Sequence, residues 1–578
     1  MARADDFTPP RPWISSYSDG VPDDIELPKS SLSDLITDSA AEWPDNVALE
    51  FFGRETSYAE LADQIARAAE GLRAFGVRKG DIVALVLPNC PQHVVAFYAA
   101  LRLGAIVVEH NPLYTPRELR HQFEDHEAKI VIAWDKVVAT IQEFPKDVRP
   151  EHIVSVNMIE AMPARLRAAL KLPLASVRRR RDALTTAVKG TTPWAKFVGG
   201  APLAGLVPAP TVDDVALIQY TSGTTGVPKG ATLTHLNLAV NAAQARAWVP
   251  DVPRGSAVVY AVLPMFHAYG LTLCLTFAMS MGARLVLFPT FDPDLVLPVI
   301  KKHPPTFLPA VPPIYERLTK AARDKKVSLK GIAISISGAM PLSQTVVEPW
   351  EKQTGGYLVE GYGLSETSPV LMANPVAENR KPGTVGLPLP GTEVRVVDPE
   401  DPTKDVKTGQ PGELVVRGPQ VFGGYWKKPE QTAEVFAADP AGGAPWFRTG
   451  DIVSIDADGF VKIVDRIKEL VITGGFNVSP SEVEDTLRQF DSVADVAIVG
   501  LPSERNGEDV VAVVVQAPGK TVDESALRAY GKANLAAYKV PRQVYLADEL
   551  PKSLIGKVLR KKVRDDLVAR LAAEEEQA

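Results

Sequence analysis

Stretches with helical and strand-like patterns alternate through the first part of this chain. Some carry apolar residues every three or four positions, and others are short apolar runs bounded by Gly, Pro or Asn. Parallel strands need a crossover helix between them, so the alternation predicts βαβ units, mostly parallel sheets and an α/β fold. The expected helices cover residues 32–43, 58–76 and 91–104, and the expected strands cover residues 47–52, 81–88, 105–111, 215–220, 284–288, 305–313 and 331–338.

The chain has 578 residues, which is too long for one hydrophobic core, so at least two domains are expected. Short strands dominate residues 412–464 and predict a small β-barrel-like subdomain. We predict an N-terminal domain of layered α/β subdomains (residues 1–465) and an α+β C-terminal domain (residues 466–578), small enough to pivot as a lid. In the latter, helices are expected at 480–490 and 524–538 and strands at 493–500 and 509–518.

Charge and cysteine content exclude several classes of protein. A net charge of −7 argues against a general nucleic-acid binder, whose affinity comes from Lys and Arg side chains that neutralise phosphates. Only two cysteines occur, Cys90 and Cys274, far apart and without the spacing of metal ligands. Both are predicted to be buried thiols in the core.

The N-terminal residues combine charges and prolines without the apolar stretch of a secretory signal, so a cytoplasmic location is expected. Residues 260–283 contain no Asp, Glu, Lys or Arg and are therefore a candidate membrane span. Pro264 and Gly270 divide this region into a strand, a loop and a buried helix. We favour that interpretation over a span.

Residues 157–207 interrupt the alternation with a basic segment. Residues 161–197 contain nine Lys and Arg against one Asp, with four consecutive arginines at 178–181. Two interpretations stay open. The segment either lies on an anionic membrane surface, as peripheral attachment to the inner face, or forms a solvated insertion.

The stretch YTSGTTGVPKG at residues 220–230 is rich in glycine and hydroxyl groups. It is not a P-loop, because Lys229 lies between Pro228 and Gly230, and Thr225 stands where a dinucleotide fingerprint needs its second glycine. A triphosphate would suit its backbone N–H groups, hydroxyls and lysine; a Ser/Thr/Gly surface linker is the alternative. An expected helix at 235–248 would place the loop in a strand-to-helix crevice. The candidate phosphate contacts are Thr221, Ser222, Gly223, Thr224, Thr225, Gly226 and Lys229.

Further segments follow this loop in a fixed order: LPMFHAYG, ISGAMPLS, EGYGLSETSP, WFRTGD, VDRIKELVITGGFNVSPSEVE and PKSLIGKVLRK. Together they resemble the adenylate-forming superfamily of acyl- and aryl-CoA ligases, luciferases and peptide-synthetase adenylation domains, from about residue 30 to residue 565. NPLYTPRELRHQ, EGYGLSETSP and GYWKKPEQT look most like bacterial long-chain fatty acid–CoA ligases.

The resemblance implies an enzyme that works in two steps. A fatty acid carboxylate attacks the α-phosphate of ATP to give acyl-adenylate and pyrophosphate, and the thiol of coenzyme A then displaces AMP. Mg²⁺ is the implied metal, and the implied partners are small molecules, with no nucleic acid. The sequence leaves the oligomeric state open, with a homodimer as one alternative.

Catalytic and metal-binding roles are carried over by position in these motifs. Lys557 matches the lysine for adenylation, a choice that spacing alone does not make over Lys561 or Lys562. Glu366 matches the metal-linked glutamate, with Thr224 as a second ligand. His267 resembles the histidine beside the acyl carboxylate, although a packed histidine is the alternative.

The nucleotide and coenzyme A contacts are also implied by the motifs. Tyr362 would stack on adenine, Asp451 and Arg466 would hold the ribose, and Lys468 occupies the hinge position. The acyl tunnel is expected among residues 262–290 and 310–340. The remaining implied contacts are Gly338, Ala339, Met340, Gly361, Gly363 and Ser365 for the nucleotide, and Gly474 and Gly475 for the pantetheine arm.

Two groups of alternatives stay open. Within the enzyme class, the substrate could be a medium-chain or aryl acid, or the acyl-adenylate could pass to a carrier protein. Outside it, the chain could be an inactive protein recruited to membranes by its basic segment. Lys229, Glu366, Asp451, Arg466 and Lys557 are all present, which argues against an inactive site.

Overall fold

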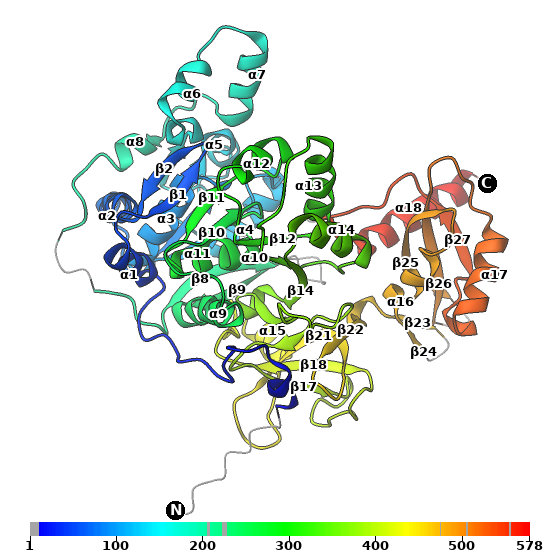
Figure 1. The fold of residues 1–578 in the computed structure, drawn as a ribbon. Coiled ribbons are helices and arrows are strands. Elements are labelled where there is room, and N and C mark those ends of the chain that lie inside the picture. Colours follow the sequence, from blue (N-terminus) through cyan, green and yellow to red (C-terminus); the bar gives the residue numbers. More distant parts are fainter. Residues whose placement is uncertain are drawn as a thin grey trace, which may run out of the picture. The chain divides into compact units, whose positions relative to one another are not determined.

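The computed structural model describes residues 11–204, 208–221, 228–473, 476–503, 507–553 and 556–577 (Figure 1). These residues form two compact units. The large unit comprises Trp13–Glu393 and Arg417–Phe436, and the small unit comprises Val394–Val416 and Ala437–Ala578 with the N-terminal residues up to Pro12.

The large unit contains two mixed sheets in which most neighbouring strands are parallel, as predicted. In the first sheet the pairs from β8 to β7 are parallel, and β9 and β19 extend it in antiparallel fashion. In spatial order this sheet contains β19 (Gly424–Tyr425), β9 (Lys229–Thr234), β8 (Val215–Thr221), β4 (Ile106–Glu109), β3 (Ile82–Val86), β5 (Ile130–Trp134), β6 (His152–Val156) and β7 (Thr192–Pro193).

The second sheet is parallel in its centre, from β14 to β1, and antiparallel at both edges. It contains, in spatial order, β16 (Leu387–Pro388), β15 (Val370–Ala373), β14 (Tyr357–Gly363), β13 (Ile334–Ser337), β12 (Phe307–Ala310), β10 (Val258–Ala261), β11 (Arg284–Leu287), β1 (Val47–Phe51) and β2 (Arg54–Ser57).

Helices α3 and α9 are buried almost all round and link the two sheets. A helix with apolar residues on every side needs packing partners on every side. The amide of Asn89, just before α3, donates to the carbonyl of Ala261 at the end of β10 at 2.9 Å and to that of Leu263 just after β10 at 2.8 Å. Asn241 of α9 exchanges two hydrogen bonds with the backbone of Val370 in β15. The start of α3 and the body of α9 are therefore both hydrogen-bonded to the second sheet.

Local signals explain where several helices begin. Capping boxes at Ser57, Thr115 and Thr234 start α2, α4 and α9. The helices of the large unit are η1 (Pro12–Ser16), α1 (Asp34–Glu42), α2 (Tyr58–Ala74), α3 (Pro91–Arg102), α4 (Pro116–His126), α5 (Asp135–Gln142), η2 (Met158–Ala161), α6 (Ala164–Ala169), α7 (Ala175–Leu184), α8 (Trp194–Phe197), α9 (His235–Trp248), α10 (Ala268–Gly270), η3 (Leu271–Thr276), α11 (Phe277–Ser280), α12 (Pro293–Ile300), α13 (Pro312–Asp324), α14 (Gln344–Thr354), η4 (Ser365–Thr367) and α15 (Pro429–Glu434).

Residues 260–283 are confirmed as a strand, a loop and buried helical turns: β10 is followed by α10, η3 and α11. Among the described residues, no helix combines the length and apolar character needed to cross a membrane. Cys90 and Cys274 are both buried free thiols, as predicted.

The small unit begins with a five-stranded sheet in which β18 pairs with β21, and β21 with β22, in antiparallel fashion. Asp451 lies directly opposite Arg466 in the β21–β22 pair. The elements of this part are β17 (Glu393–Val397), β18 (Gly412–Arg417), β20 (Phe436–Ala437), β21 (Trp446–Ile455), β22 (Val461–Arg466) and η5 (Ile467–Glu469).

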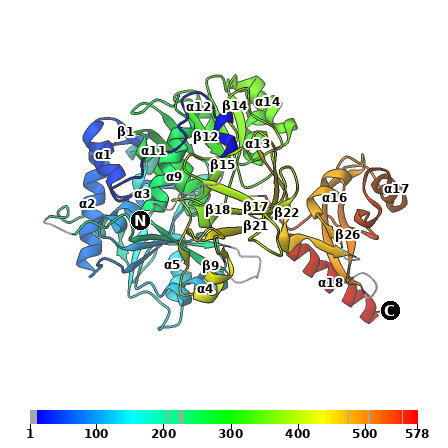
Figure 2. The ribbon, with the colours of Figure 1, turned by 90° about the horizontal axis from the view of Figure 1, so that it is seen from below.

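A second five-stranded sheet follows and is covered on both faces. Successive residues of β25 alternate between two clusters: Val496 and Ile498 pack under α16 and α17, while Ala497 and Val499 pack under α18. Figure 2 shows α16 and α17 on one side of β26 and α18 on the other. The elements are β23 (Val471–Thr473), β24 (Phe476–Val478), α16 (Pro480–Leu487), β25 (Val493–Ser503), β26 (Gly507–Gln516), α17 (Glu524–Asn534), η6 (Ala537–Lys539), β27 (Gln543–Leu546) and α18 (Arg560–Gln577).

Candidate active site

Several residues of the predicted site lie outside the described part of the chain. Of the phosphate loop, the structure describes its two ends, Thr221 and Lys229. Lys468 lies in the short helix η5. The predicted contacts outside the described residues are Ser222, Gly223, Thr224, Thr225, Gly226, Gly474 and Gly475.

The phosphate loop joins two antiparallel strands. Thr221 at the end of β8 pairs with Lys229 at the start of β9, and α9 begins only at His235. The helix predicted at 235–248 is confirmed as α9. The predicted strand-to-helix crevice was wrong, because residues 229–234 form an additional strand between β8 and β19. The strands on either side of the loop, β8 and β9, are thus an antiparallel pair, and α9 begins only after β9.

Tyr425 of β19 connects Lys229 of β9 to Glu366, the predicted metal-binding residue. The ammonium of Lys229 lies over the Tyr425 ring, 5.1 Å from its centroid. The Tyr425 hydroxyl donates to Oε1 of Glu366 in η4 at 2.9 Å. Tyr425 was missed as a site residue because it is far from both partners in sequence, although it lies in the GYWKKPEQT segment.

Glu366 is held in place by both its side chain and its backbone. It is only 9% exposed, and its carbonyl accepts a hydrogen bond from the Phe422 amide at 2.8 Å. Burial first, and then the charge and hydrogen bond of Glu366, raise the pKa of Tyr425, so this hydroxyl stays protonated. A carboxylate with a fixed orientation fits Mg²⁺, which prefers hard oxygen ligands.

Replacing Tyr425 by phenylalanine should weaken Mg²⁺ use without removing it. The Glu366 carboxylate keeps its charge but loses the donor that orients it, and such outer partners are worth about tenfold or more in metal affinity. We expect the Mg²⁺ concentration for half-maximal pyrophosphate release to rise about tenfold. Tyr357→Phe is the matched control, since it removes a surface Tyr–Glu hydrogen bond to Glu378. An equal shift in both variants would contradict the proposed link.

A cavity of about 90 Å³ in the large unit brings together residues from three of the predicted motifs. Its apolar walls include Trp248, Leu273 and Phe307, and backbone of β14 lies at its edge. Ala245 and Trp248 of α9 extend the expected acyl region beyond residues 262–290 and 310–340. Of the predicted residues, His267, Gly338, Ala339, Gly361, Tyr362, Gly363 and Ser365 line this cavity, and Met340 is not among those that do.

Close backbone packing explains two residue types at this cavity. A Cβ at Gly363 would lie 1.7 Å from the carbonyl oxygen of Pro369, so any side chain there would displace the strand pair β14–β15. Ala339 has a φ of 66°, a strained conformation for a residue with a side chain. Strain of this kind is concentrated at ligand-binding positions, which is consistent with a binding role for residues 338–339.

His267 precedes α10 and faces the same cavity. Its side chain has accessible surface, yet the surrounding protein desolvates it and lowers the pKa of the imidazole. The ring is therefore neutral at neutral pH. A neutral imidazole has one N–H donor, which suits an ionised carboxylate.

Substituting His267 by alanine should lower kcat/KM for adenylation about tenfold, the worth of one hydrogen bond. If the neutral ring is the working form, wild-type activity is full above the lowered pKa and falls as pH decreases through it. His267→Gln keeps an N–H donor that does not titrate. In this variant the fall of activity at low pH, the acid limb of the pH profile, should therefore disappear. Measuring pyrophosphate release from acid to neutral pH checks the idea, and an unchanged acid limb in His267→Gln would contradict it.

The small unit brings the predicted ribose contacts together. The Asp451 side chain is only 2% exposed, and its Oδ1 accepts from Nε of Arg466 at 2.8 Å. The pairing compensates the charge of a buried carboxylate and fixes its orientation. This is the arrangement needed to accept hydrogen bonds from two ribose hydroxyls.

Lys557 belongs to the same charged cluster. Burial first, and then the nearby Arg466, lower the pKa of its ammonium, whereas Glu469 and Asp451 act in the opposite direction. Its carbonyl accepts from the Ser553 amide at 2.8 Å. Lys561 and Lys562 lie exposed on α18. Burial thus distinguishes Lys557 from the two lysines that spacing could not exclude.

Arg560, which sequence reasoning missed, anchors the segment that carries Lys557. Its guanidinium binds both carboxylate oxygens of Glu484, each at 2.7 Å, and also pairs with Glu469. It contacts the Ser481 hydroxyl at 2.7 Å. No pattern in the sequence signals this role, because the partners are far away along the chain.

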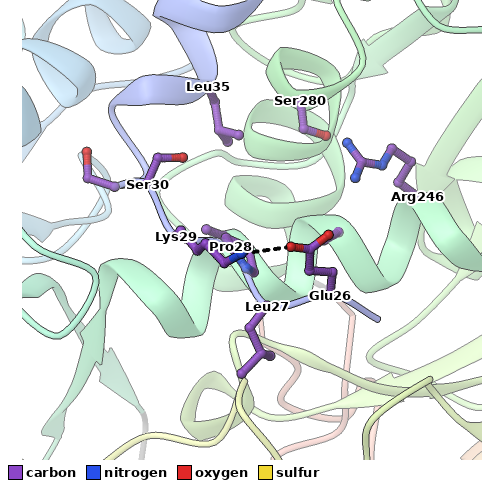
Figure 3. Close-up of a pocket in the computed structure, with 11 residues that line it drawn as sticks. Glu26, Leu27, Pro28, Lys29, Ser30, Leu35, Arg246 and Ser280 are labelled. Atoms are coloured by element: carbon purple, nitrogen blue, oxygen red, sulfur yellow. Dashed lines mark hydrogen bonds and ion pairs between the residues drawn. The ribbon is translucent and has the colours of Figure 1, made fainter. Parts of the chain in front are cut away.

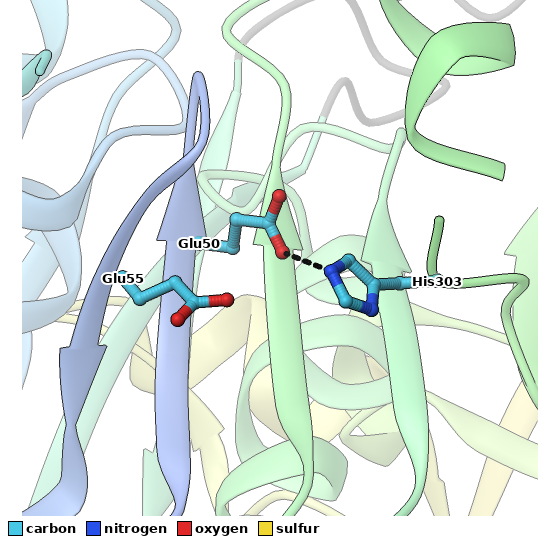
Figure 4. Close-up of side chains that lie close together, drawn as sticks. All are labelled: Glu50, Glu55 and His303. Atoms are coloured by element: carbon cyan, nitrogen blue, oxygen red, sulfur yellow. Dashed lines mark ion pairs between the residues drawn. The ribbon is translucent and has the colours of Figure 1, made fainter. Parts of the chain in front are cut away.

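The large unit also contains a second cavity and a group of titratable side chains, both outside the predicted site. A cavity of about 300 Å³ lies between residues 26–35, α9 and Ser280, and Arg246 points into it (Figure 3). Glu50, Glu55 and His303 come close together (Figure 4). Arg284 binds Glu50 at 2.6 Å and Glu55 at 2.5 Å, so its charge already compensates these carboxylates, and the cluster is a structural ion-pair network.

Comparison with known proteins places these features in a family. The chain matches the model of the AMP-binding enzyme over residues 36–426 and that of the AMP-binding enzyme C-terminal domain over residues 482–557. It is 36% identical to the long-chain-fatty-acid–CoA ligase of Bacillus subtilis over 567 residues, which cover 96% of this chain and 98% of the relative.

Solved structures resemble the fold of this protein over nearly its whole chain. The ATP-bound MatB of Rhodopseudomonas palustris matches with a TM-score of 0.77 and 31% identity, over 93% of this chain and 99% of that one. An anthranilate CoA ligase in complex with anthranoyl-AMP matches with a TM-score of 0.78 and 25% identity, over 94% and 99%. The motifs, the fold and the full-length identity lead to one conclusion: the chain is an enzyme of the AMP-binding family, and it carries both the main and the C-terminal domain of that family.

Proposed function

We propose that this enzyme is a long-chain fatty acid–CoA ligase, which converts a fatty acid, ATP and coenzyme A to acyl-CoA, AMP and pyrophosphate. The observation that carries the proposal is the 36% identity to a long-chain-fatty-acid–CoA ligase over 96% of this chain. The cavity lined by His267 and residues 361–365 has apolar walls, which suit the part of an acyl chain next to its carboxylate.

Adenylation joins two anions, so the enzyme must place positive charge between them. In the proposed mechanism Lys557 contacts the reacting carboxylate and α-phosphate, and Lys229 contacts the phosphates that leave. Asp451 and Arg466 hold the ribose, and Tyr362 stacks on adenine. Mg²⁺, held by Glu366 and Thr224, would shield the pyrophosphate when bound.

The second half-reaction needs a path for the thiol of coenzyme A. We propose that the C-terminal domain, residues 466–578, pivots at Lys468 between the half-reactions. Lys557 then leaves the adenylate, and Gly474 and Gly475 line the path of the pantetheine arm. Glycines suit this path because a ligand can pass close to their backbone.

A second candidate is a medium-chain or aryl acid–CoA ligase, and the cavity size favours it. Pockets for drug-sized ligands usually measure about 300–1,000 Å³, whereas the cavity at His267 measures about 90 Å³. A long acyl chain would need the walls formed by α9 and η3 to move apart. An acyl-adenylate ligase that serves a carrier protein is the remaining alternative.

Release of AMP that depends on coenzyme A, measured for acids from acetate to oleate and for cinnamates, tests the proposal. A maximum with long-chain acids supports it, and a maximum with shorter or aromatic acids supports the second candidate. Pyrophosphate release without thioester formation would assign the enzyme to the carrier-protein class. Neither product with any acid, from demonstrably folded protein, would overturn all three.

We also propose that the enzyme works in the cytoplasm and associates peripherally with the inner face of a membrane. The basic segment at 157–207 supports this location. Long-chain acids partition into bilayers, so attachment would place the enzyme where its substrate is concentrated.

A further inference from the structure

The helices α6 and α7 form an excursion from the body of the large unit. Neither helix contains a buried residue, and Figure 1 shows both helices projecting beyond the sheets. The two ends of the excursion are anchored. Arg54 donates to the Glu160 carbonyl at 3.2 Å, and the Trp134 indole donates to the Leu184 carbonyl at 2.8 Å. The structure thus holds residues 163–181, the tip segment, in place although none of them is buried.

The tip segment concentrates positive charge that the protein itself does not neutralise. Its four consecutive arginines span one helical turn, so cations surround α7 on every side. Arg181 pairs with its neighbour Asp182 at 3.2 Å. The other six cations form no ion pair with any residue that the structure describes: Arg165, Arg167, Lys171, Arg178, Arg179 and Arg180. In a chain of net charge −7, this concentration marks a surface for an anionic partner.

Two leucines between the helices specify the kind of partner. Leu172 is 50% exposed and Leu174 is 57% exposed, and both lie in the turn between α6 and α7. A surface that only contacts water or phosphate gains nothing from exposed leucines. Leucines flanked by Lys and Arg are the pattern of segments that lie in the headgroup region of a bilayer.

We propose that the tip segment docks on a bilayer containing anionic lipids. Leu172 and Leu174 enter the boundary between headgroups and acyl chains, while the arginines and Lys171 contact lipid phosphates. RNA shares the phosphate chemistry but offers no apolar layer for the leucines, so the bilayer is the better match. If the proposed function holds, docking brings the enzyme to fatty acids dissolved in the membrane.

Co-sedimentation with vesicles tests the docking step. The wild-type protein should pellet with vesicles of phosphatidylglycerol and phosphatidylcholine in equal parts, and stay in solution with phosphatidylcholine alone. The variant with Arg178, Arg179 and Arg180 changed to Gln should bind at least tenfold more weakly, since each basic residue near an anionic surface contributes several-fold. Leu172→Gln combined with Leu174→Gln should also weaken binding, and high salt should weaken the wild type most.

The matched control removes the same number of positive charges from another part of the large unit. Lys301, Lys302 and Lys320 are exposed, and changing all three to Gln should leave vesicle binding unchanged. Equal binding by the arginine variant and the wild type would overturn the inference, as would equal loss in the lysine control. If polyuridylate displaces the wild type from the vesicles and binds through the same arginines more tightly, the surface belongs to RNA. Thermal unfolding of each variant confirms that the fold is intact, which is expected because the tip segment has no buried contacts.

A second readout separates this inference from the proposed function. With oleate in neutral detergent micelles, the arginine variant and the wild type should form acyl-CoA at the same rate. With oleate in the anionic vesicles, the variant should be at least tenfold slower at low lipid concentration. If neither protein forms acyl-CoA in micelles but the wild type still binds vesicles, the proposed function fails and the docking surface stands.

Discussion

Replacing Lys557 by alanine is expected to stop acyl-adenylate formation while the transfer of a supplied acyl-adenylate to coenzyme A continues at its normal rate. Only the first half-reaction brings a carboxylate against a phosphate. Loss of one well-placed charge or donor at a developing anion costs about 100- to 1,000-fold in rate. The measurements are pyrophosphate release from ATP and acid, and thioester formation from synthetic acyl-adenylate and coenzyme A.

Lys561→Ala is the control for this experiment, because it removes a lysine from the same basic stretch at an exposed position on α18. It should leave both half-reactions unchanged. Arg560 anchors this segment to Glu484 and should keep it folded in both variants. If Lys557→Ala slows both half-reactions equally, the prediction that Lys557 acts in adenylation alone is wrong.

The environment of Lys557 predicts a pH effect in the same assay. Burial and neighbouring arginines lower the pKa of the ammonium. A cation is needed for adenylation, so the rate should be full below this lowered pKa and should fall as pH rises through it. Thioester formation from supplied acyl-adenylate should lack this alkaline limb. Lys557→Arg, whose charge persists, should shift the limb of adenylation to higher pH if it retains activity.

Much of the fold follows from local patterns in the sequence. The helix expected at 235–248 is α9, and a capping box at Thr234 starts it. The strands β9, β19 and β27 were not predicted. What makes each of them a strand is pairing with a partner strand, which in β19 lies far away along the chain. Local propensity contains no information about such partners.

The candidate site likewise contains residues that motifs in the sequence indicated and residues that only the folded structure reveals. Motifs indicated His267, Gly338 and Tyr362, which the structure brings to one cavity. Tyr425 and Arg560 could not be found, since each acts through a partner that only folding brings close: Glu366, 59 residues away, and Glu484, 76 residues away. The choice of Lys557 over its neighbours likewise depends on burial in the folded chain.

Changing Glu366 to glutamine should lower the rate of pyrophosphate release about 100-fold or more, because the charge proposed to hold Mg²⁺ at the leaving group is lost. Glutamine keeps the shape and can still accept a hydrogen bond from the Tyr425 hydroxyl. The change therefore tests the charge of the carboxylate and little else. Raising the Mg²⁺ concentration should restore part of the rate, whereas Tyr425→Phe should be restored almost completely.

Glu360→Gln is the matched control, since Glu360 is also 9% exposed and lies on the neighbouring strand β14. Its carboxylate accepts from the Asn374 amide at 3.0 Å and the Gly383 amide at 3.1 Å, and burial raises its pKa, so removing its charge should cost little activity. The two variants differ only in which buried carboxylate is neutralised. A comparable loss of pyrophosphate release in both would mean that Glu366 supports the fold and not the metal. A large loss in Glu366→Gln alone, relieved by Mg²⁺, would assign the metal to that carboxylate.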